Sequence, residues 1–114
     1  AVAVGAVSGA LMALRRVDFE GLGGFDAGYF LHVEDVDICR RAEDAGWRVL
    51  FVPGPHGVHV RSSSGATPGE VARHKARSFA RYFRKFARSP LERALSWIVG
   101  PVLYVLLPLT AGRR

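Results

Sequence analysis

Cysteine is nearly absent from this sequence of 114 residues, which holds a single one, Cys39. An internal disulfide is therefore excluded, and the composition fits a reducing compartment. Cys39 stands in an acidic segment, where it is more typical of a small packed side chain than of a nucleophile.

Charge is absent from the first fourteen residues, an apolar run rich in Ala and Val. A secretory signal places basic residues before such a run, whereas Arg15 and Arg16 follow it here, so the order is reversed. The short side chains suit a chain segment that is covered on both faces of a sheet. We therefore interpret residues 1–14 as a buried strand and loop.

Acidic residues are scarce in the second half of the chain. Residues 61–93 contain nine Lys or Arg and two acidic residues, Glu70 and Glu92, which gives a net charge of +7. Residues 1–60 contain five Arg and eight Asp or Glu, a net charge of −3. An acidic half is thus followed by a basic arm, in a chain long enough for one modest domain.

Three carboxylates, Glu34, Asp35 and Asp37, open a predicted helix that runs to Ala45 and stops at Gly46. Unpaired backbone N–H groups and the positive end of the helix dipole favour negative charge in a first turn. Acidic residues are common there for that reason, so the cluster alone is also explained by plain capping.

The residues around this helix start form a longer sequence motif, and this motif resembles that of the family 2 glycosyltransferases. It is most similar to the rhamnosyltransferase-like branch, which builds cell-surface polysaccharide. The resemblance covers about residues 5 to 80, and the order of its pieces is more specific than any one of them. The pieces are Gly23-Gly24-Phe25-Asp26, the aromatic pair Tyr29-Phe30, Glu34-Asp35-Val36-Asp37-Ile38-Cys39-Arg40-Arg41, Ala45-Gly46-Trp47, an apolar strand and Val52-Pro53.

The resemblance implies an α/β fold, the carboxyl-terminal half of a GT-A domain with a mixed sheet. We expect residues 1–66 to be the acceptor-side catalytic half, 67–89 a basic amphipathic helix, and 90–114 an apolar membrane-associated helix with a basic tail. The nucleotide-binding half, with its Asp-x-Asp metal motif, is expected before residue 1. The chain is therefore expected to be part of a longer enzyme and inactive alone.

The resemblance also implies an inverting transferase that uses a nucleotide sugar and a glycan or lipid-linked acceptor. Asp35 would be the base that takes the proton from the acceptor hydroxyl, and Glu34 beside it would assist. Asp37, Gly9 and Phe30 would border or bind the acceptor. Gly9 is equally explained as a residue that relieves crowding in a sheet.

The same resemblance implies a divalent metal, Mg²⁺ or Mn²⁺, held mostly by the expected donor half. His59 matches the family's histidine and is the candidate ligand here, although a histidine satisfied within the protein fits as well. Arg61 and Ser64 are candidates for binding phosphate, while a flexible serine loop would also explain this segment.

A helix is predicted from Pro68 to about Arg88, with Thr67 as its cap and Glu70 in its first turn. Its pattern places apolar residues on one stripe and arginines on another, which predicts an amphipathic helix with a cationic face. The apolar stripe is Ala72, Ala76, Phe79, Phe83 and Phe86, and the basic one Arg73, Arg77, Arg81, Arg84 and Arg88.

Residues 94–111 carry no charge, which is near the lower limit for a helix that crosses a membrane. Gly100, Pro101 and Pro108 would kink such a helix. A helix on or in an anionic membrane surface, at the cytoplasmic face of the cell membrane, is as compatible with the pattern as a full span. A helix packed on the expected donor half is the alternative.

Two other classes of function compete. A non-catalytic membrane-anchoring module would explain the basic and apolar helices without any transfer reaction. A nucleic-acid module would use the basic helix, with its aromatic residues stacking on bases. The apolar segment that follows points to lipid instead, so no nucleic-acid partner is expected.

Overall fold

The computed structural model describes residues 1–59, 65 and 67–111. These residues form two compact units. The first unit contains residues 1–28 and 34–59, and the second contains residues 29–33, 65 and 67–111. The predicted division into three segments is finer than this one and stays a prediction.

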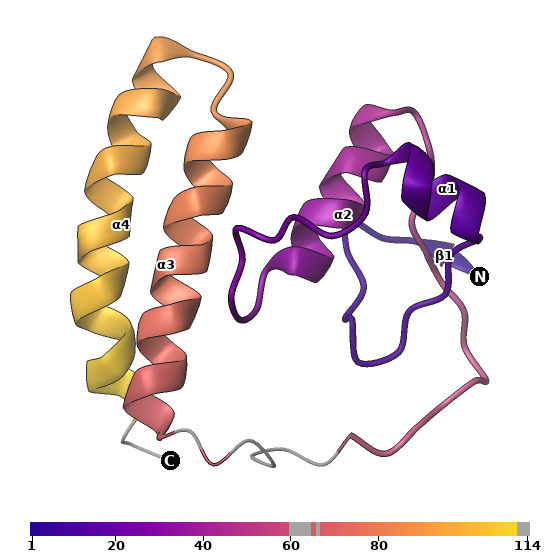
Figure 1. Ribbon diagram of the computed structural model, residues 1–114, viewed down its shortest axis with the longest axis horizontal. Helices are drawn as coiled ribbons and strands as arrows, with labels where there is room; N and C mark the ends of the chain where they lie inside the picture. The colour runs from indigo at the N-terminus through magenta and orange to yellow at the C-terminus, as the bar shows by residue number, and fades with distance from the viewer. Residues whose placement is uncertain (60–64, 66, 112–114) are drawn as a thin grey trace. The chain divides into compact units, whose positions relative to one another are not determined.

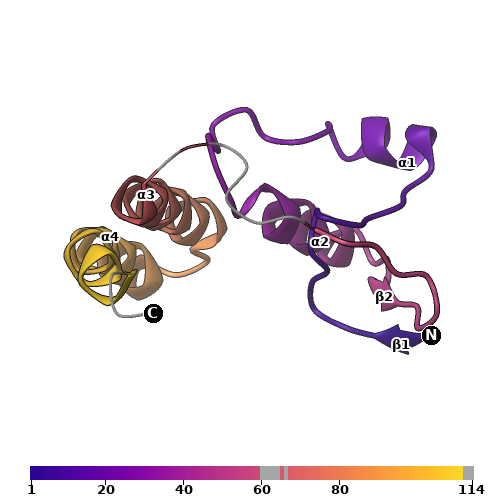
Figure 2. The same cartoon turned by 90° about the horizontal axis from the view of Figure 1, so that it is seen from below.

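The first unit consists of β1 (Val2–Ala3), α1 (Arg16–Gly21), α2 (Glu34–Asp44) and β2 (Leu50–Phe51) (Figures 1 and 2). β1 pairs antiparallel with β2, Val2 opposite Phe51 and Ala3 opposite Leu50. One further bond, from Val4 N–H to the carbonyl of Val49 at 3.0 Å, continues the pairing.

The predictions for the strands were largely wrong. The expected mixed sheet is replaced, in the part of the chain that is described, by this single antiparallel pair. In the expected buried strand and loop of residues 1–14, the strand is two exposed residues long, and the expected apolar strand before Val52-Pro53 is also two exposed residues long. Two strands alone cannot cover either face of a sheet, which is why their side chains remain exposed.

α1 begins without a side-chain cap. Arg15 is the N-cap residue, and it makes no capping bond through its side chain. Its guanidinium instead donates to both carboxylate oxygens of Asp18, at 2.6 and 2.8 Å. The bidentate ion pair occupies the carboxylate that would otherwise cap the helix.

α2 ends at Asp44, one residue before the predicted Ala45, and the predicted stop, Gly46, has a φ of +82° in the left-handed region. The N–H groups of Gly46 and Trp47 donate to the carbonyls of Glu43 and Ala42, both at 2.9 Å. This paired closure of the last turn is the Schellman motif, which a glycine adopts without steric cost. The buried side of α2 carries Asp37, Ile38, Cys39 and Ala42.

The second unit is built on α3 (Pro68–Phe86) and α4 (Pro90–Ala111), which lie side by side in both views (Figures 1 and 2). The predicted cap of α3 is confirmed, because Thr67 and Glu70 form a complete capping box. The two helices approach closely at Gly100, where an added Cβ would lie 2.9 Å from the Cβ of Ala80.

The buried stripe of α3 differs from the predicted one. Ala72, Ala76, Ser78 and Ala80 are buried, whereas Phe83 is 42% exposed. Small side chains allow the close approach of α4, and large rings in the same positions would hold the helices apart. Phe79 and Phe86, the other two predicted phenylalanines, are half-buried.

α4 continues through Pro101 and Pro108 as one helix. Residues Pro90–Thr110 are long and apolar enough to cross a membrane by length and composition, and 11% of an 18-residue apolar window within them is buried. The core helix of a soluble protein, which is mostly buried, meets the same criteria of length and composition. Its exposed apolar residues include Leu91, Leu95, Trp97, Ile98, Val102, Val105, Leu106 and Leu109.

Candidate active site

The carboxylate of Asp35, in the first turn of α2, accepts hydrogen bonds from two backbone amides. Its Oδ2 accepts a hydrogen bond from Gly9 N–H, and its Oδ1 accepts one from Val36 N–H, each at 2.8 Å. The side chain is half-buried, and among residues 1–59, 65 and 67–111 it forms no ion pair. A carboxylate fixed in this way keeps lone pairs on both oxygens for a third partner.

Gly9 lies against the side chain of Asp35, with room for a small side chain of its own. An added Cβ would lie 3.4 Å from the Cβ and 3.6 Å from the Oδ2 of Asp35. The loop around Gly9 is turned by a bond from Ala10 N–H to the Ser8 hydroxyl at 3.2 Å. The structure thus brings together two residues that are 26 positions apart and that the sequence analysis predicted for the same site.

Glu34, the residue before Asp35, has one carboxylate oxygen, Oε2, that is buried without a hydrogen-bond partner among the described residues. A buried polar atom without a partner costs about 1–3 kcal/mol. Such an atom can accept a hydrogen bond from a ligand hydroxyl or from another segment of protein.

Asp37 has a different environment, with its side chain fully buried at 0% exposure. It accepts a hydrogen bond from Arg41 Nε at 2.6 Å. The same guanidinium donates to the carbonyl of Leu22 and, at 2.8 Å, to that of Gly24. Asp37 and Arg41 therefore tie α2 to the glycine-rich loop. The predicted role of Asp37 in binding acceptor stays a prediction, and its observed contacts are structural.

Arg41 is the residue of this site that the sequence analysis did not single out. The signal was present, because Asp37 and Arg41 stand four positions apart on one predicted helix. Oppositely charged residues at this spacing face each other. What the spacing did not indicate is the second contact of Arg41, with carbonyls that precede α2 in the sequence.

The loop of residues 29–33, which leads into Glu34, packs on α3. Tyr29 is buried, and the cationic groups of Arg81 and Lys85 lie 5.5 and 5.8 Å from its ring centre. The Ser78 hydroxyl donates to the carbonyl of Leu31 at 2.8 Å. Helix α3 therefore fixes the chain directly before the acidic turn.

Phe30, in the same loop, was predicted to bind acceptor. Its ring is 81% exposed and lies 4.7 Å, centre to centre, from that of His74 on α3. The exposed ring leaves an apolar surface open to a ligand, and the predicted role stays a prediction.

Backbone strain accumulates at the end of this loop. His32 and Val33, immediately before Glu34, have φ values of 65° and 76°. Positive φ is unfavourable for a side chain that carries a Cβ, and most of all for a β-branched one such as Val33. Strain of about 1–3 kcal/mol per residue persists only where surrounding contacts impose the conformation. The contacts of residues 29–31 with α3 are contacts of this kind.

The predicted metal ligand, His59, belongs to no metal-binding cluster among the described residues. Across the described parts of the chain, no three side chains of His, Cys, Asp or Glu are placed to hold one metal ion. His59 is exposed. The residues present therefore do not fit a metal site of their own. Arg61 and Ser64, predicted to bind phosphate, lie outside the described residues.

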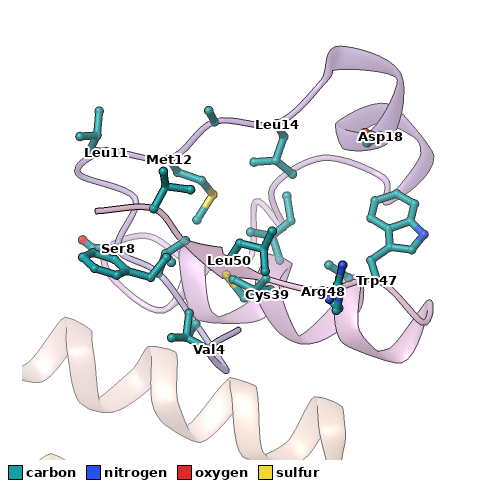
Figure 3. A pocket seen from close by; sticks show the side chains of 18 of the residues that line it. Val4, Ser8, Leu11, Met12, Leu14, Asp18, Cys39, Trp47, Arg48 and Leu50 are labelled. Carbon is teal, nitrogen blue, oxygen red and sulfur yellow. The ribbon is translucent and has the colours of Figure 1, made fainter. Parts of the chain in front are cut away.

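An apolar pocket of about 990 Å³ lies in the first unit, behind α2 (Figure 3). Met12, Leu14 and Leu50 line it together with Cys39, whereas Asp35 does not. Burial raises the pKa of the Cys39 thiol above its ordinary value, so the thiol stays protonated near neutral pH. This agrees with the prediction of a packed side chain and argues against a nucleophile.

Comparison with known proteins gives one family match and several similar proteins for this chain. The sequence model described as "Glycosyltransferase like family 2" matches residues 1–88. The "N-acetylglucosaminyl-diphospho-decaprenol L-rhamnosyltransferase" of Mycobacterium tuberculosis is 40% identical over 76 residues, which cover 64% of this chain and 25% of that protein. "Rhamnosyltransferase WbbL" of Escherichia coli K12 is 44% identical over 52 residues, which cover 46% of this chain and 20% of that protein.

The chain spans a quarter or less of the length of the curated relatives it matches. No solved structure gives a significant match.

Proposed function

Because the chain belongs to glycosyltransferase family 2, whose members have a GT-A fold, we propose that it supplies the acceptor side of an inverting transferase. The enzyme would move a sugar from a nucleotide donor to a lipid-linked glycan acceptor of the cell surface. Both curated relatives are named rhamnosyltransferases, which supports rhamnose as the sugar to test first.

The observation that carries this proposal is that two backbone amides hold the carboxylate of Asp35. In an inverting transfer, the acceptor oxygen attacks the anomeric carbon while the bond from that carbon to the nucleotide diphosphate breaks. The hydroxyl proton passes to the base, which we assign to Asp35. Two backbone amides orient the carboxylate, and no arginine neutralises it among the described residues.

Glu34 would bind the acceptor beside the base. Its buried Oε2 lacks a partner in the described part of the chain, and an acceptor hydroxyl could donate to it. Gly9 would act through Asp35, because its amide bonds the carboxylate.

A second segment of protein would complete the first unit. Val2, Leu11 and Phe51 are each more than half exposed, and the apolar pocket behind α2 is open. These surfaces suit packing against a donor-binding half, which the greater length of the relatives leaves room for. A divalent metal would take its ligands from that half, so none of the steps assigned here uses one.

The second unit would hold the enzyme at the cytoplasmic face of the membrane. The exposed apolar residues of α4 and the arginines of α3 suit a helix pair that contacts lipid chains and anionic headgroups. The mycobacterial relative is named after a diphospho-decaprenol acceptor, and a long polyprenol of this kind is a membrane lipid. A membrane-bound acceptor requires an enzyme at the same surface.

The test is Asp35→Asn in the complete enzyme, with Glu43→Gln on the exposed side of the same helix as the matched control. The amide keeps the shape of the side chain and removes its basicity, so we expect kcat to fall about 10²- to 10⁴-fold. The control should retain nearly full turnover. Retained turnover in Asp35→Asn, with unchanged circular dichroism, removes Asp35 from the role of base.

A non-catalytic membrane-anchoring module is the second candidate, and the exposed apolar surface of α4 favours it. It predicts vesicle binding by the wild-type protein without transfer of sugar from any nucleotide donor. Detection of transfer that depends on Asp35 decides against it.

A further inference from the structure

We propose that the groove between α3 and α4 binds the diphosphate group of a polyprenyl diphosphate, with Arg77 and Arg84 as its ligands. This inference rests on the proposed lipid-linked acceptor and assigns the binding site for its anionic head. It concerns the second unit alone.

The groove has a volume of about 370 Å³, within the range of small-molecule sites. Small or rigid residues, here called the floor, line the groove together with two arginines and one tyrosine. The lining residues are Ala76, Arg77, Ala80, Arg84, Gly100, Pro101, Tyr104 and Val105.

The close approach of the two helices explains why the floor is made of small, mostly apolar residues. Gly100 is buried at the contact with Ala80, and an added Cβ would come within 2.9 Å of it. Because no long side chain stands between the helices here, the arginine side chains of α3 can reach over the groove. The low polarity of the floor strengthens their interaction with an anion.

Both arginines stack on aromatic rings of α4. The Cζ of Arg77 lies 5.6 Å from the centre of the Tyr104 ring, and that of Arg84 lies 5.2 Å from the centre of the Trp97 ring. Stacking uses the face of a guanidinium and leaves its N–H edge available for bidentate bonds to phosphate. Neither arginine forms an ion pair within the described parts of the chain.

The two arginines offer one guanidinium for each phosphoryl group of a diphosphate. Positions 77 and 84 are seven residues apart, so they lie on one face of α3 about 10.5 Å apart along its axis. The two phosphorus atoms of a diphosphate are much closer together than this, so both long side chains must extend toward each other over the groove to bind it. Each guanidinium would then bind one phosphoryl group.

The surface beside the groove indicates that the ligand also carries a hydrocarbon chain. Val105 lines the groove and is itself 61% exposed, next to the apolar side chains of Val102, Leu106 and Leu109 on α4. A soluble diphosphate would leave these residues in water. A polyprenyl diphosphate would cover them with its chain while its head occupies the groove.

The test is cosedimentation of the full chain with neutral phosphatidylcholine vesicles that contain polyprenyl diphosphate. We expect Arg77→Gln with Arg84→Gln to weaken binding at least about tenfold, since each bond to a charged group contributes substantially. Arg73→Gln with Lys75→Gln is the matched control, because it removes the same charge from α3 outside the groove. It should weaken binding less than about threefold, as expected for general electrostatics.

Three results would overturn the inference. The first is equal loss of binding in the groove variant and its control. The second is equal binding to phosphatidylglycerol vesicles of matched charge, which would indicate a general anionic surface. The third is equally tight binding of inorganic pyrophosphate, which would indicate a site for free phosphate.

The binding assay separates this inference from the proposed catalysis. Asp35→Asn should bind polyprenyl diphosphate vesicles as well as the wild-type chain does. Selective binding without any transfer by the complete enzyme would refute the proposed function and leave the groove assignment standing.

Discussion

The backbone amide of Gly9 donates a 2.8 Å hydrogen bond to the carboxylate of Asp35, across 26 residues of sequence. This bond links an apolar loop to the first turn of α2. It fixes the direction of a side chain that would otherwise rotate freely about two torsions. The proposed base thus owes its orientation to a residue without a side chain.

Removing the Gly9 amide should impair transfer. Gly9→Pro deletes the N–H group, and loss of a hydrogen bond to a charged group costs about 1.5–3 kcal/mol. We expect kcat to fall about 10- to 150-fold. Gly9→Ala keeps the amide, and its Cβ would lie at an ordinary contact distance of 3.4 Å from Asp35, so it should be tolerated. Gly5→Pro, in open space in the same loop, is the backbone control. Equal losses in both proline variants would contradict the orienting role.

Asp37 should be essential for stability. Asp37→Asn removes one partner of the buried pair with Arg41, which should lower the free energy of unfolding by about 3–5 kcal/mol. Asp44→Asn breaks the more exposed pair with Arg40 on the same helix and should cost less than about 1 kcal/mol. Urea unfolding measures both. A stable Asp37→Asn enzyme with a raised KM for acceptor would instead support the predicted acceptor contact.

Ser78 should affect catalysis through the loop that precedes Glu34. Ser78→Ala removes the bond to the Leu31 carbonyl and should cost about 1–1.5 kcal/mol of stability. We also expect a lower kcat, because the loop is less firmly held. Ser96, equally buried, donates to the carbonyl of Arg93 in its own helix. If Ser96→Ala lowers kcat to the same extent, the effect of Ser78→Ala is one of general stability.

The stability of the first turn of α3 should fall at acidic pH. Hydrogen bonds from the Thr67 side chain and backbone hold the pKa of Glu70 below its usual range. The stabilisation is complete above the unfolded pKa of about 4.3 and is lost as the pH falls through the lower folded pKa. Circular dichroism of the chain between pH 6 and pH 2.5 should show this loss of helix. Glu70→Gln should flatten that part of the curve, and an unchanged curve would rule out Glu70 as its source.

Cys39 should be unreactive in the folded protein. Its raised pKa keeps the thiol neutral, so iodoacetamide at pH 8 should modify it far more slowly than in urea. The unfolded thiol ionises first as the pH rises above about 8.5, so stability should fall there. Cys39→Ala should remove that fall. Rapid modification of the native protein would show that Cys39 is accessible.

The helices could be predicted closely because their signals are local. Thr67, Pro68 and Glu70 mark the start of α3, and the observed capping box confirms them. Gly46 marks the end of α2, where the observed φ is positive. A cap or a stop needs only residues a few positions apart, so its chemistry is complete within the sequence.

The strands and the buried face of α3 could not be predicted in the same way. A strand needs a partner from elsewhere in the chain, and the predicted run over residues 1–14 finds one for two residues. On α3, the predicted apolar stripe contained both alanines and phenylalanines, and its pattern did not indicate which of them meet α4. The approach of Gly100 to Ala80 decides for the alanines, because a ring would keep α4 away.

The sequence by itself determined where α2 begins and ends, the acidic character of its first turn, and the family motif that surrounds it. Only the tertiary structure decided which carboxylate is open to a ligand. Asp35 and Asp37 are two positions apart, about 200° around a helix, and so face opposite sides. One side meets the amide of Gly9 and the other meets Arg41, and those partners are set by the folded chain rather than by the helix.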